Sequence, residues 1–167
     1  LKFLASDAQS YVEFGYSVSL SSVGNTALIG AYREGTGGTD AGAAYVFTRS
    51  SGTWTQQQKI TASDAEAYDN FGYSVSLSSD GNMALVGAYF EDPSGLSSAG
   101  SAYVFTRSSG TWTQQQKITA SDAQVSDNFG HSVSISSDGN TALVGAYFED
   151  PSGLSSAGAG YIFTRAS

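Results

Sequence analysis

The sequence lacks cysteine altogether and has one histidine, one methionine and two prolines among its 167 residues. The absence of cysteine excludes disulfides, thiolate metal sites and cysteine nucleophiles. Charge is also sparse: charged residues make up 13% of the chain, and seven basic against fifteen acidic residues give a formal net charge of −8. A chain of this charge repels a phosphate backbone, so nucleic acid is not an expected partner. The apolar runs fall well short of the roughly 20 residues of a membrane-spanning helix, and we expect no membrane insertion.

What the sequence does contain is three near-copies of one segment. Residues Phe14–Leu20 return as Phe71–Leu77 and, slightly altered, as Phe129–Ile135. The copies begin at residues 14, 71 and 129, a spacing of 57 and then 58 residues. A fixed period of this size indicates a repeat architecture, because one unit alone cannot bury its apolar faces.

The second copy is the most regular, and its first half predicts two strands. Residues Tyr73–Ser78 alternate between apolar and small polar side chains, as a strand with two different faces requires. The dipeptide Asp80-Gly81 follows, in a place where a tight hairpin needs positive φ. Residues Met83–Tyr89 are apolar or small throughout and are therefore expected to be buried on both faces.

The second half of the copy predicts two further strands beyond a surface loop. Ser101–Arg107 is rich in aromatic and β-branched residues, which favour strands. Thr111–Ile118 is the most polar segment and suits an outer strand with one wet face. Four antiparallel strands graded from buried to exposed, repeated at constant spacing, are typical of β-propeller blades. We therefore predict an all-β chain of three four-stranded blades, at approximately residues 1–49, 50–107 and 108–167.

Two short motifs recur at the same places in all three copies. Phe-Gly stands at residues 14, 71 and 129, and each is followed by an apolar-Gly-Ala motif: Ile29-Gly30-Ala31, Val86-Gly87-Ala88 and Val144-Gly145-Ala146. This pattern resembles the FG-GAP repeat of integrin α-subunit propellers. The Trp-Thr-Gln-Gln-Gln-Lys-Ile segment is closer still to a bacterial-type branch of secreted and surface proteins. The resemblance implies a propeller, commonly of seven blades, used for adhesion or recognition, and an extracellular or cell-surface location.

Three blades do not close a ring, which takes at least about four. The segment Lys2–Ala8 aligns with Lys59–Ala65, the end of an outer strand, so we expect an N-terminal strand over residues 1–6 to complete a blade edge. Head-to-tail contact between copies would form either a six-bladed ring or a filament. The alternative is that the chain is an excerpt of a longer, seven-bladed protein. The expected assembly edge consists of Lys2, Phe3, Leu4 and Ala5 against Tyr161, Ile162 and Phe163.

No catalytic residue is predicted. His131 occupies the repeat position of Tyr16 and Tyr73, which favours aromatic packing over a role as a general base. No cofactor is predicted either, and calcium is the one metal for which candidates exist. Asp69 and Asp127, just before Phe-Gly, are those candidates, although a calcium ion needs six to eight oxygen ligands. The hairpins also depart from the Asp-x-Asp-x-Asp-Gly form that the family uses for calcium.

The remaining acidic residues and the tryptophans carry two weaker hypotheses. Glu34, Glu91 and Glu149 lie in loops and are expected to serve solubility and turn formation. Trp54 and Trp112 are candidate stacking platforms for a sugar, although aromatic residues at repeated positions more often pack between blades.

Together these features predict a non-enzymatic, extracellular structural or adhesive protein whose partners are copies of itself. The alternative is a propeller that binds a carbohydrate or a surface protein. Binding predicts that loops differ between copies, whereas residues 91–100 and 149–158 are identical. This identity favours structural use.

Overall fold

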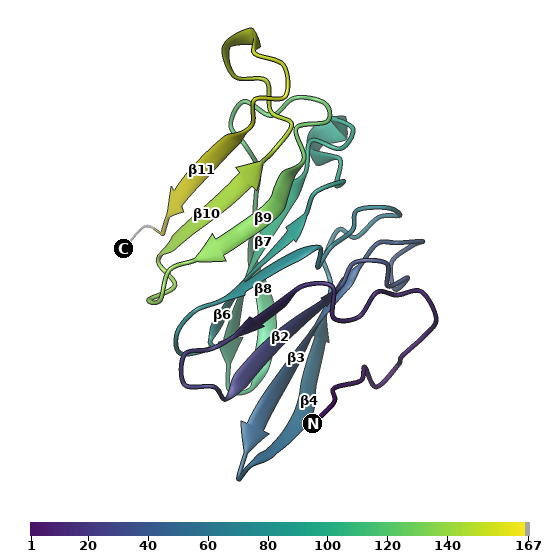
Figure 1. Ribbon diagram of the computed structural model, residues 1–167, viewed down its shortest axis with the longest axis vertical. Coiled ribbons are helices and arrows are strands. Elements are labelled where there is room, and N and C mark those ends of the chain that lie inside the picture. The colour runs from purple at the N-terminus through teal and green to yellow at the C-terminus, as the bar shows by residue number, and fades with distance from the viewer. Residues whose placement is uncertain (166–167) are drawn as a thin grey trace.

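The computed structural model describes residues 1–165, which form three antiparallel sheets (Figure 1). We call these sheets blades 1, 2 and 3. Blade 1 consists of β1 (Val18–Leu20), β2 (Thr26–Ala31), β3 (Ala43–Ser50) and β4 (Thr53–Ile60), hydrogen-bonded in that order. Blade 2 repeats the order with β5 (Ser74–Leu77), β6 (Met83–Ala88), β7 (Ser101–Ser108) and β8 (Thr111–Ile118). Blade 3 has β9 (Phe129–Ile135), β10 (Thr141–Ala146) and β11 (Ala159–Thr164).

The predicted strands and their order are confirmed, except that blade 3 has three of its four predicted strands within residues 1–165. The outer strands β4 and β8 pair with the strands before them, so the blades end after residues 60 and 118 rather than at 49 and 107. Short 3₁₀ turns, η1 (Pro93–Gly95) and η2 (Pro151–Gly153), lie in the loops between β6 and β7 and between β10 and β11. No helix within residues 1–165 is long and apolar enough to cross a membrane.

Burial follows the composition of each strand. All six residues of β2 are buried, because blade 2 covers one face of the strand and the N-terminal segment packs on the other. The polar strand β4 is exposed or partly exposed at every residue except Ile60, as expected of an outer strand. The hairpin between β5 and β6 turns at Gly81, whose φ of 69° is readily adopted by glycine. Asp80 fixes this hairpin by accepting hydrogen bonds from the Ser78 hydroxyl at 2.6 Å and the Asn82 N–H at 3.0 Å.

Two of the three buried apolar clusters lie between blades, and the third lies on the outward face of blade 1, where Phe3 and Ala5 of the N-terminal segment pack on Ile29 and Phe47. Leu28 and Val46 of blade 1 share a buried cluster with Val86 and Phe105 of blade 2. On the opposite face of blade 2, Leu85 joins a second cluster with residues of blade 3. Burial of one such side chain contributes about 1.5 to 3 kcal/mol. Contacts between consecutive blades therefore supply two of these clusters, in keeping with the repeat architecture.

Candidate functional site

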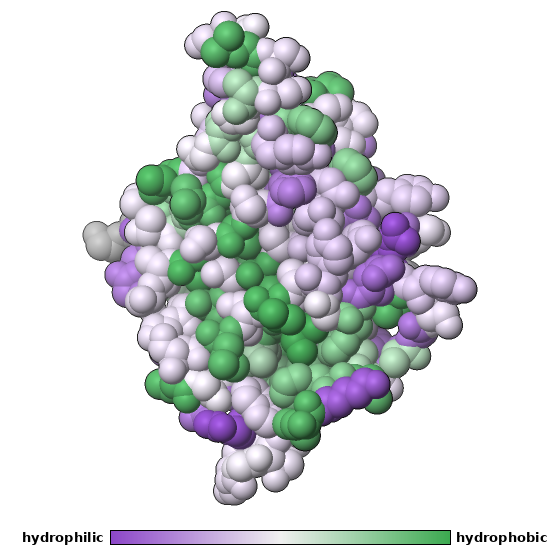
Figure 2. Space-filling view, viewed as in Figure 1, coloured by the Kyte–Doolittle hydropathy of each residue, from purple (hydrophilic) through white to green (hydrophobic). Residues whose placement is uncertain are grey.

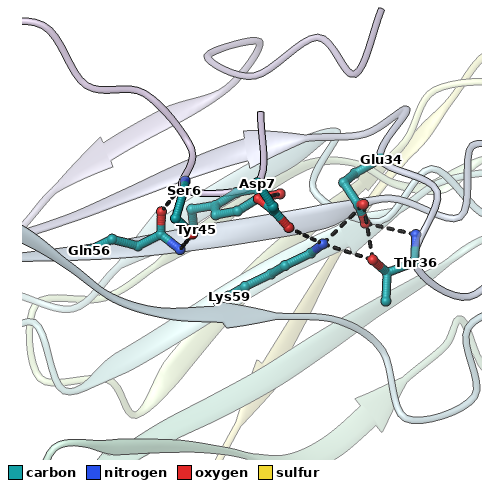
Figure 3. Close-up of polar contacts among 7 residues, drawn as sticks. All are labelled: Ser6, Asp7, Glu34, Thr36, Tyr45, Gln56 and Lys59. Carbon is teal, nitrogen blue, oxygen red and sulfur yellow. Dashed lines mark hydrogen bonds and ion pairs between the residues drawn. The ribbon is translucent and has the colours of Figure 1, made fainter. Parts of the chain in front are cut away.

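A lysine near the end of the outer strand of blade 1 holds two carboxylates together (Figure 3). The Nζ atom of Lys59 lies 2.8 Å from a carboxylate oxygen of Asp7 and 3.0 Å from one of Glu34. Glu34 also accepts hydrogen bonds from the backbone N–H and the hydroxyl of Thr36, and the Tyr45 hydroxyl donates to Asp7 at 2.9 Å. Charge therefore fixes the N-terminal segment, the loop between β2 and β3, and β4 to one another.

These contacts shift the pKa values of the cluster. The hydrogen bond from Lys59 lowers the pKa of Asp7. Burial by itself would lower the pKa of Lys59, but the hydrogen bonds and charges of Asp7 and Glu34 outweigh burial and raise it. Both directions favour the charged forms, so Asp7 and Lys59 are ionised together at neutral pH.

Blade 2 repeats the cluster with equivalent residues. The Nζ atom of Lys117 lies 2.8 Å from Asp64 and 2.7 Å from Glu91, and the Ser101 hydroxyl donates to the other oxygen of Glu91. Asp64 follows β4, so this cluster ties the exit of blade 1 to blade 2. The buried side chains of Glu34 and Glu91 correct the expectation that these acidic loops serve solubility: their carboxylates anchor the blades.

Within the part of the chain that the structure describes, blade 3 has the carboxylates and the tyrosine of this cluster but no lysine. Asp122 accepts a hydrogen bond from the Tyr161 hydroxyl at 2.9 Å, as Asp7 does from Tyr45. Glu149 is only 4% exposed, and its Oε2 atom has no hydrogen-bond partner within residues 1–165. Burial and the negative charges of neighbouring aspartates raise the pKa of Glu149. Blade 3 thus holds a buried carboxylate without the cation that its two counterparts have.

Consecutive blades are also joined by a repeated set of hydrogen bonds, which we call the seam. The Ser17 hydroxyl donates to the carbonyl oxygen of Gly72 at 2.8 Å, and the Ser74 hydroxyl donates to that of Gly130 at 2.7 Å. Two residues after each of these serines a second hydrogen bond is made: the Leu77 N–H donates to the Ser19 hydroxyl at 3.0 Å. The Ile135 N–H donates to the Ser76 hydroxyl at the same distance.

The seam requires glycine where the backbones approach. A Cβ atom on Gly30 would overlap the carbonyl oxygen of Gly72, and one on Gly87 would overlap that of Gly130. Only glycine lacks that atom, which explains why the apolar-Gly-Ala motif recurs in each blade. The equivalent Gly145 in blade 3 would meet only the Ser132 side chain of its own blade within 3 Å.

The two outward faces of the blade series carry the unmatched halves of the seam. On blade 3, Ser132 and Ser134 are exposed, and neither hydroxyl makes a hydrogen bond within residues 1–165. Leu143 is 48% exposed, whereas its equivalents Leu28 and Leu85 are fully buried. In Figure 2, apolar side chains, in green, form a band across the middle of the view, and separate green patches lie over the sheet of β9, β10 and β11. On blade 1, Leu20 is 60% exposed, although its equivalent in blade 2 is buried.

A row of aromatic rings crosses all three blades. Tyr73 lies between Tyr16, at 4.8 Å between ring centroids, and His131, at 5.0 Å. His131 continues the row to Tyr147 at 4.3 Å. Burial among these rings lowers the pKa of His131. The histidine therefore occupies an aromatic packing position, as its place in the repeat indicated.

The two tryptophans have different surroundings. Trp112 is buried in the core between blades 1 and 2, where its indole N–H donates to Gln57 at 3.0 Å. This burial corrects its assignment as a stacking platform, because a buried ring offers no free face to a sugar. Trp54 is partly exposed and contacts Phe3 edge-on at 5.4 Å.

The two calcium candidates act as turn caps. Asp69 accepts a hydrogen bond from the Glu66 N–H at 2.7 Å, and Asp127 accepts one from the Gln124 N–H at 2.6 Å. Burial raises the pKa of Asp69 to about 6. Within residues 1–165, no group of three or more histidine, cysteine or acidic residues is placed to hold a metal ion.

The residues of the expected assembly edge lie at opposite ends of the molecule (Figure 1). The expected N-terminal strand is wrong for the single chain: residues 1–6 form no strand and instead pack on blade 1 as a segment without regular secondary structure. Phe3 stacks at 4.8 Å from Phe47, Ala5 is buried, and Leu4 is exposed together with Lys2. At the other end, Tyr161 and Phe163 pack on Phe129, whereas Ile162 is 70% exposed.

Sequence reasoning missed the lysine–carboxylate clusters. A signal was nevertheless present, because Glu34 recurs as Glu91 and Glu149 while Lys59 recurs as Lys117. Opposite charges that recur at fixed positions of a repeat indicate a structural pair. Which glutamate meets which lysine depends on strand register, which the sequence does not specify.

The meander sheets and the glycine seam define this chain as a series of β-propeller blades. The FG-GAP repeat model matches residues 1–47, 54–105 and 112–163, so the chain belongs to the FG-GAP repeat family. Among solved structures, the periplasmic gluconolactonase PpgL of Pseudomonas aeruginosa is similar, with a TM-score of 0.53 and 20% identity over 80% of this chain and 37% of that one. At this identity the likeness concerns the fold alone. No match was found among curated proteins.

Proposed function

We propose that this chain is a non-enzymatic, extracellular structural or adhesive protein that assembles head-to-tail, with blade 3 of one copy docking on blade 1 of the next. The observation that carries the proposal is the unmatched seam. Blade 3 presents the hydroxyls of Ser132 and Ser134 beside the exposed Leu143. Blade 1 presents Gly15, the equivalent of the acceptors Gly72 and Gly130, at its opposite face.

Burial supports a second copy as the occupant of these faces. A chain in water that exposes side chains such as Leu20 and Leu143 gains free energy when a second copy covers them. Residues 1–165 contain one face of each kind, so blade 3 of one copy can meet blade 1 of another. Such contacts are heterologous, and they either close into a ring or continue as a filament.

The proposal is tested by the mass of the assembly. Multi-angle light scattering over a concentration series should show multiples of the chain mass, and negative-stain images should show uniform rings or long filaments. The variant Gly145→Ala is the sharpest probe, because its new methyl group faces the next copy and has little to displace within its own blade. We expect it to fold normally and remain monomeric. A wild-type chain that stays monomeric up to its solubility limit would overturn the proposal.

A second candidate function is carbohydrate binding, and the aromatic row favours it. Tyr16 and Tyr147 are about half exposed and stand at the two ends of this row. Exposed tyrosine rings provide apolar faces with a polar tip, which suits stacking against a sugar. A glycan array followed by titration calorimetry tests this function: a specific ligand whose affinity falls in Tyr147→Ala would support it, and an array without binding would contradict it.

A further inference from the structure

Each blade has one pair of neighbouring carboxylates, formed by an aspartate and a glutamate, and the chain has as many lysines as such pairs. Only two of the lysines bind a pair within the described residues. The chain has three lysines, namely Lys2, Lys59 and Lys117. Lys59 and Lys117 each bridge a carboxylate pair, and the third pair is Asp122 with Glu149. Within residues 1–165, Lys2 forms no ion pair, and the third carboxylate pair has no lysine. One lysine and one buried acceptor therefore remain, at opposite ends of the molecule.

In the two complete blades the lysine always enters from the outer strand. Lys59 of β4 stands opposite Tyr45, and Lys117 of β8 stands opposite Tyr103. In blade 3 the equivalent tyrosine is Tyr161 of β11, and this strand pairs only with β10 within the described residues. The free edge of β11 is thus the place from which a lysine opposite Tyr161 would reach both carboxylates.

A second feature beside this edge is also shaped for an outer strand. A cleft of 230 Å³ lies between blades 2 and 3 and is lined by Gln116, Phe163 and Arg165, among others. At the corresponding place between blades 1 and 2, Trp112 of the outer strand β8 is seated, and its backbone N–H donates to Gln58 at 2.8 Å. In blade 2, β8 thus supplies both the tryptophan that occupies the equivalent of this cleft and the lysine that pairs with the equivalent of Glu149.

We propose that the free edge of β11 accepts the N-terminal segment of a second copy, with the ammonium group of Lys2 placed between Asp122 and Glu149. The inference rests on the proposed head-to-tail assembly and names the contact that locks it. Lys2–Ala8 aligns with Lys59–Ala65, so Lys2 would stand opposite Tyr161 as Lys59 stands opposite Tyr45.

The N-terminal segment is already held in the required position on its own blade 1. The Ser6 N–H donates to Gln56 at 2.9 Å, as the Ser63 N–H donates to Gln114 at 2.9 Å. Asp7 binds Lys59 as Asp64 binds Lys117, at 2.8 Å in both cases. Residues just after Lys2 therefore need no rearrangement when another blade 3 docks, which reduces the entropy lost on binding.

An engineered disulfide tests the strand register directly, and the absence of native cysteine removes background. Val46 stands opposite Gln58 in blade 1, which places Ile162 opposite Leu1 of the second copy. Both side chains are exposed in the single chain. Under mild oxidation, Leu1→Cys with Ile162→Cys should give covalent multimers on a non-reducing gel. The control Leu1→Cys with Leu154→Cys places the second thiol in an exposed loop away from the edge and should give few or none.

Charge exchange tests the ion pair itself. Lys2→Glu and Glu149→Lys each bring like charges together at the proposed contact, so each should weaken assembly at least tenfold. An equimolar mixture of the two variants should assemble again, because every junction then joins opposite charges. Lys2→Gln and Glu149→Gln provide milder versions if a buried lysine at residue 149 prevents folding, which circular dichroism would reveal.

The outcomes separate this inference from the proposed function. Assembly that is unaffected by Lys2→Glu and Lys2→Gln would overturn the lysine contact while leaving head-to-tail assembly intact. Equal cross-linking of the test and control cysteine pairs would likewise overturn the strand register. A wild-type chain that never assembles would overturn the proposed function and the inference with it.

A synthetic peptide with the sequence of residues 111–120 provides an independent test, because it contains both the tryptophan and the lysine of an outer strand. We expect it to bind the β11 edge, filling the cleft and the carboxylate pair together, and to displace the second copy. A peptide in which both residues are replaced by alanine is the matched control. Failure of the natural peptide to bind more tightly than this control would overturn the assignment of the edge as an acceptor for an outer strand.

Discussion

The hydroxyl of Ser74 donates to the carbonyl oxygen of Gly130 in the same way that the hydroxyl of Ser17 donates to that of Gly72. The bond joins equivalent residues of consecutive blades, so the interface is a property of the repeat rather than of one unique surface. Each further blade with this sequence can dock by the same contacts. This relationship is the physical basis of the proposed assembly.

Replacement of Gly87 by alanine should destabilise the folded chain by about 3 kcal/mol, because the added methyl group overlaps the backbone of blade 3 and forces the blades apart. The matched variant Gly145→Ala should cost about 1 kcal/mol or less, since only the flexible Ser132 side chain must move. Urea unfolding at low protein concentration measures both free energies. Similar losses in the two variants would contradict the close approach at the seam.

Glu34→Gln should destabilise the isolated chain, whereas Glu149→Gln should not. Glu34→Gln leaves Lys59 with a weaker partner in a largely buried site and should cost about 2 to 4 kcal/mol. Glu149→Gln removes a buried negative charge that has no cation within the described chain and should be neutral or slightly stabilising. Thermal unfolding of dilute samples compares the two, and equal destabilisation would mean that Glu149 is already paired.

Replacement of Glu13 by asparagine should strengthen both the fold and the assembly. Glu13 has a φ of 56°, in the left-handed region, and its equivalents in the other blades are Asn70 and Asn128. Asparagine tolerates this conformation better than glutamate does, and its amide can donate across the seam, as Asn70 donates to the carbonyl oxygen of Asp40 at 3.0 Å. We expect a gain of about 1 kcal/mol in unfolding free energy and tighter association.

The control for this variant is Glu13→Ala, which lacks the amide and should not tighten association. Analytical ultracentrifugation of both variants over a concentration series provides the dissociation constants. An asparagine variant that associates no better than wild type would show that the residue does not face the next copy.

Asp69 should make the fold less stable as pH rises from about 4 to about 6. Its pKa in the folded chain is about 6, raised from 3.8 by burial, so in this window the folded state binds more protons than the unfolded state. The loss is complete above the folded pKa and amounts to about 1 to 3 kcal/mol. Asp69→Asn keeps an acceptor for the Glu66 N–H without the charge and should therefore gain stability over wild type at pH 7 but not at pH 4.

Unfolding by urea at these two pH values measures this difference. The relevant quantity is the change between pH values, because neighbouring carboxylates such as Asp64 contribute with the opposite sign. A variant whose advantage over wild type is the same at both pH values would contradict the raised pKa.

The sequence alone determined the strands and their order. Alternation in Tyr73–Ser78, the apolar run Met83–Tyr89 and the polar run Thr111–Ile118 are local patterns, and local patterns decide which face of a strand meets solvent. The repeat also determined that blades must stack, because strands buried on both faces need neighbours on both sides. The Asp80-Gly81 turn followed from the backbone requirements of a tight hairpin.

Only the tertiary structure decided the partners of the charged and aromatic side chains. Lys59 meets Asp7 and Glu34 because three distant segments converge at the end of β4, and Trp112 is buried because blade 1 covers it. Such contacts depend on strand register and on the angle between blades. A shift of one residue in the register would turn these side chains to the opposite face of the sheet. The unmatched state of Glu149 was also decided by the tertiary structure. Residues 147–158 are identical to residues 89–100, and Glu149 differs from Glu91 because it has no lysine partner within residues 1–165.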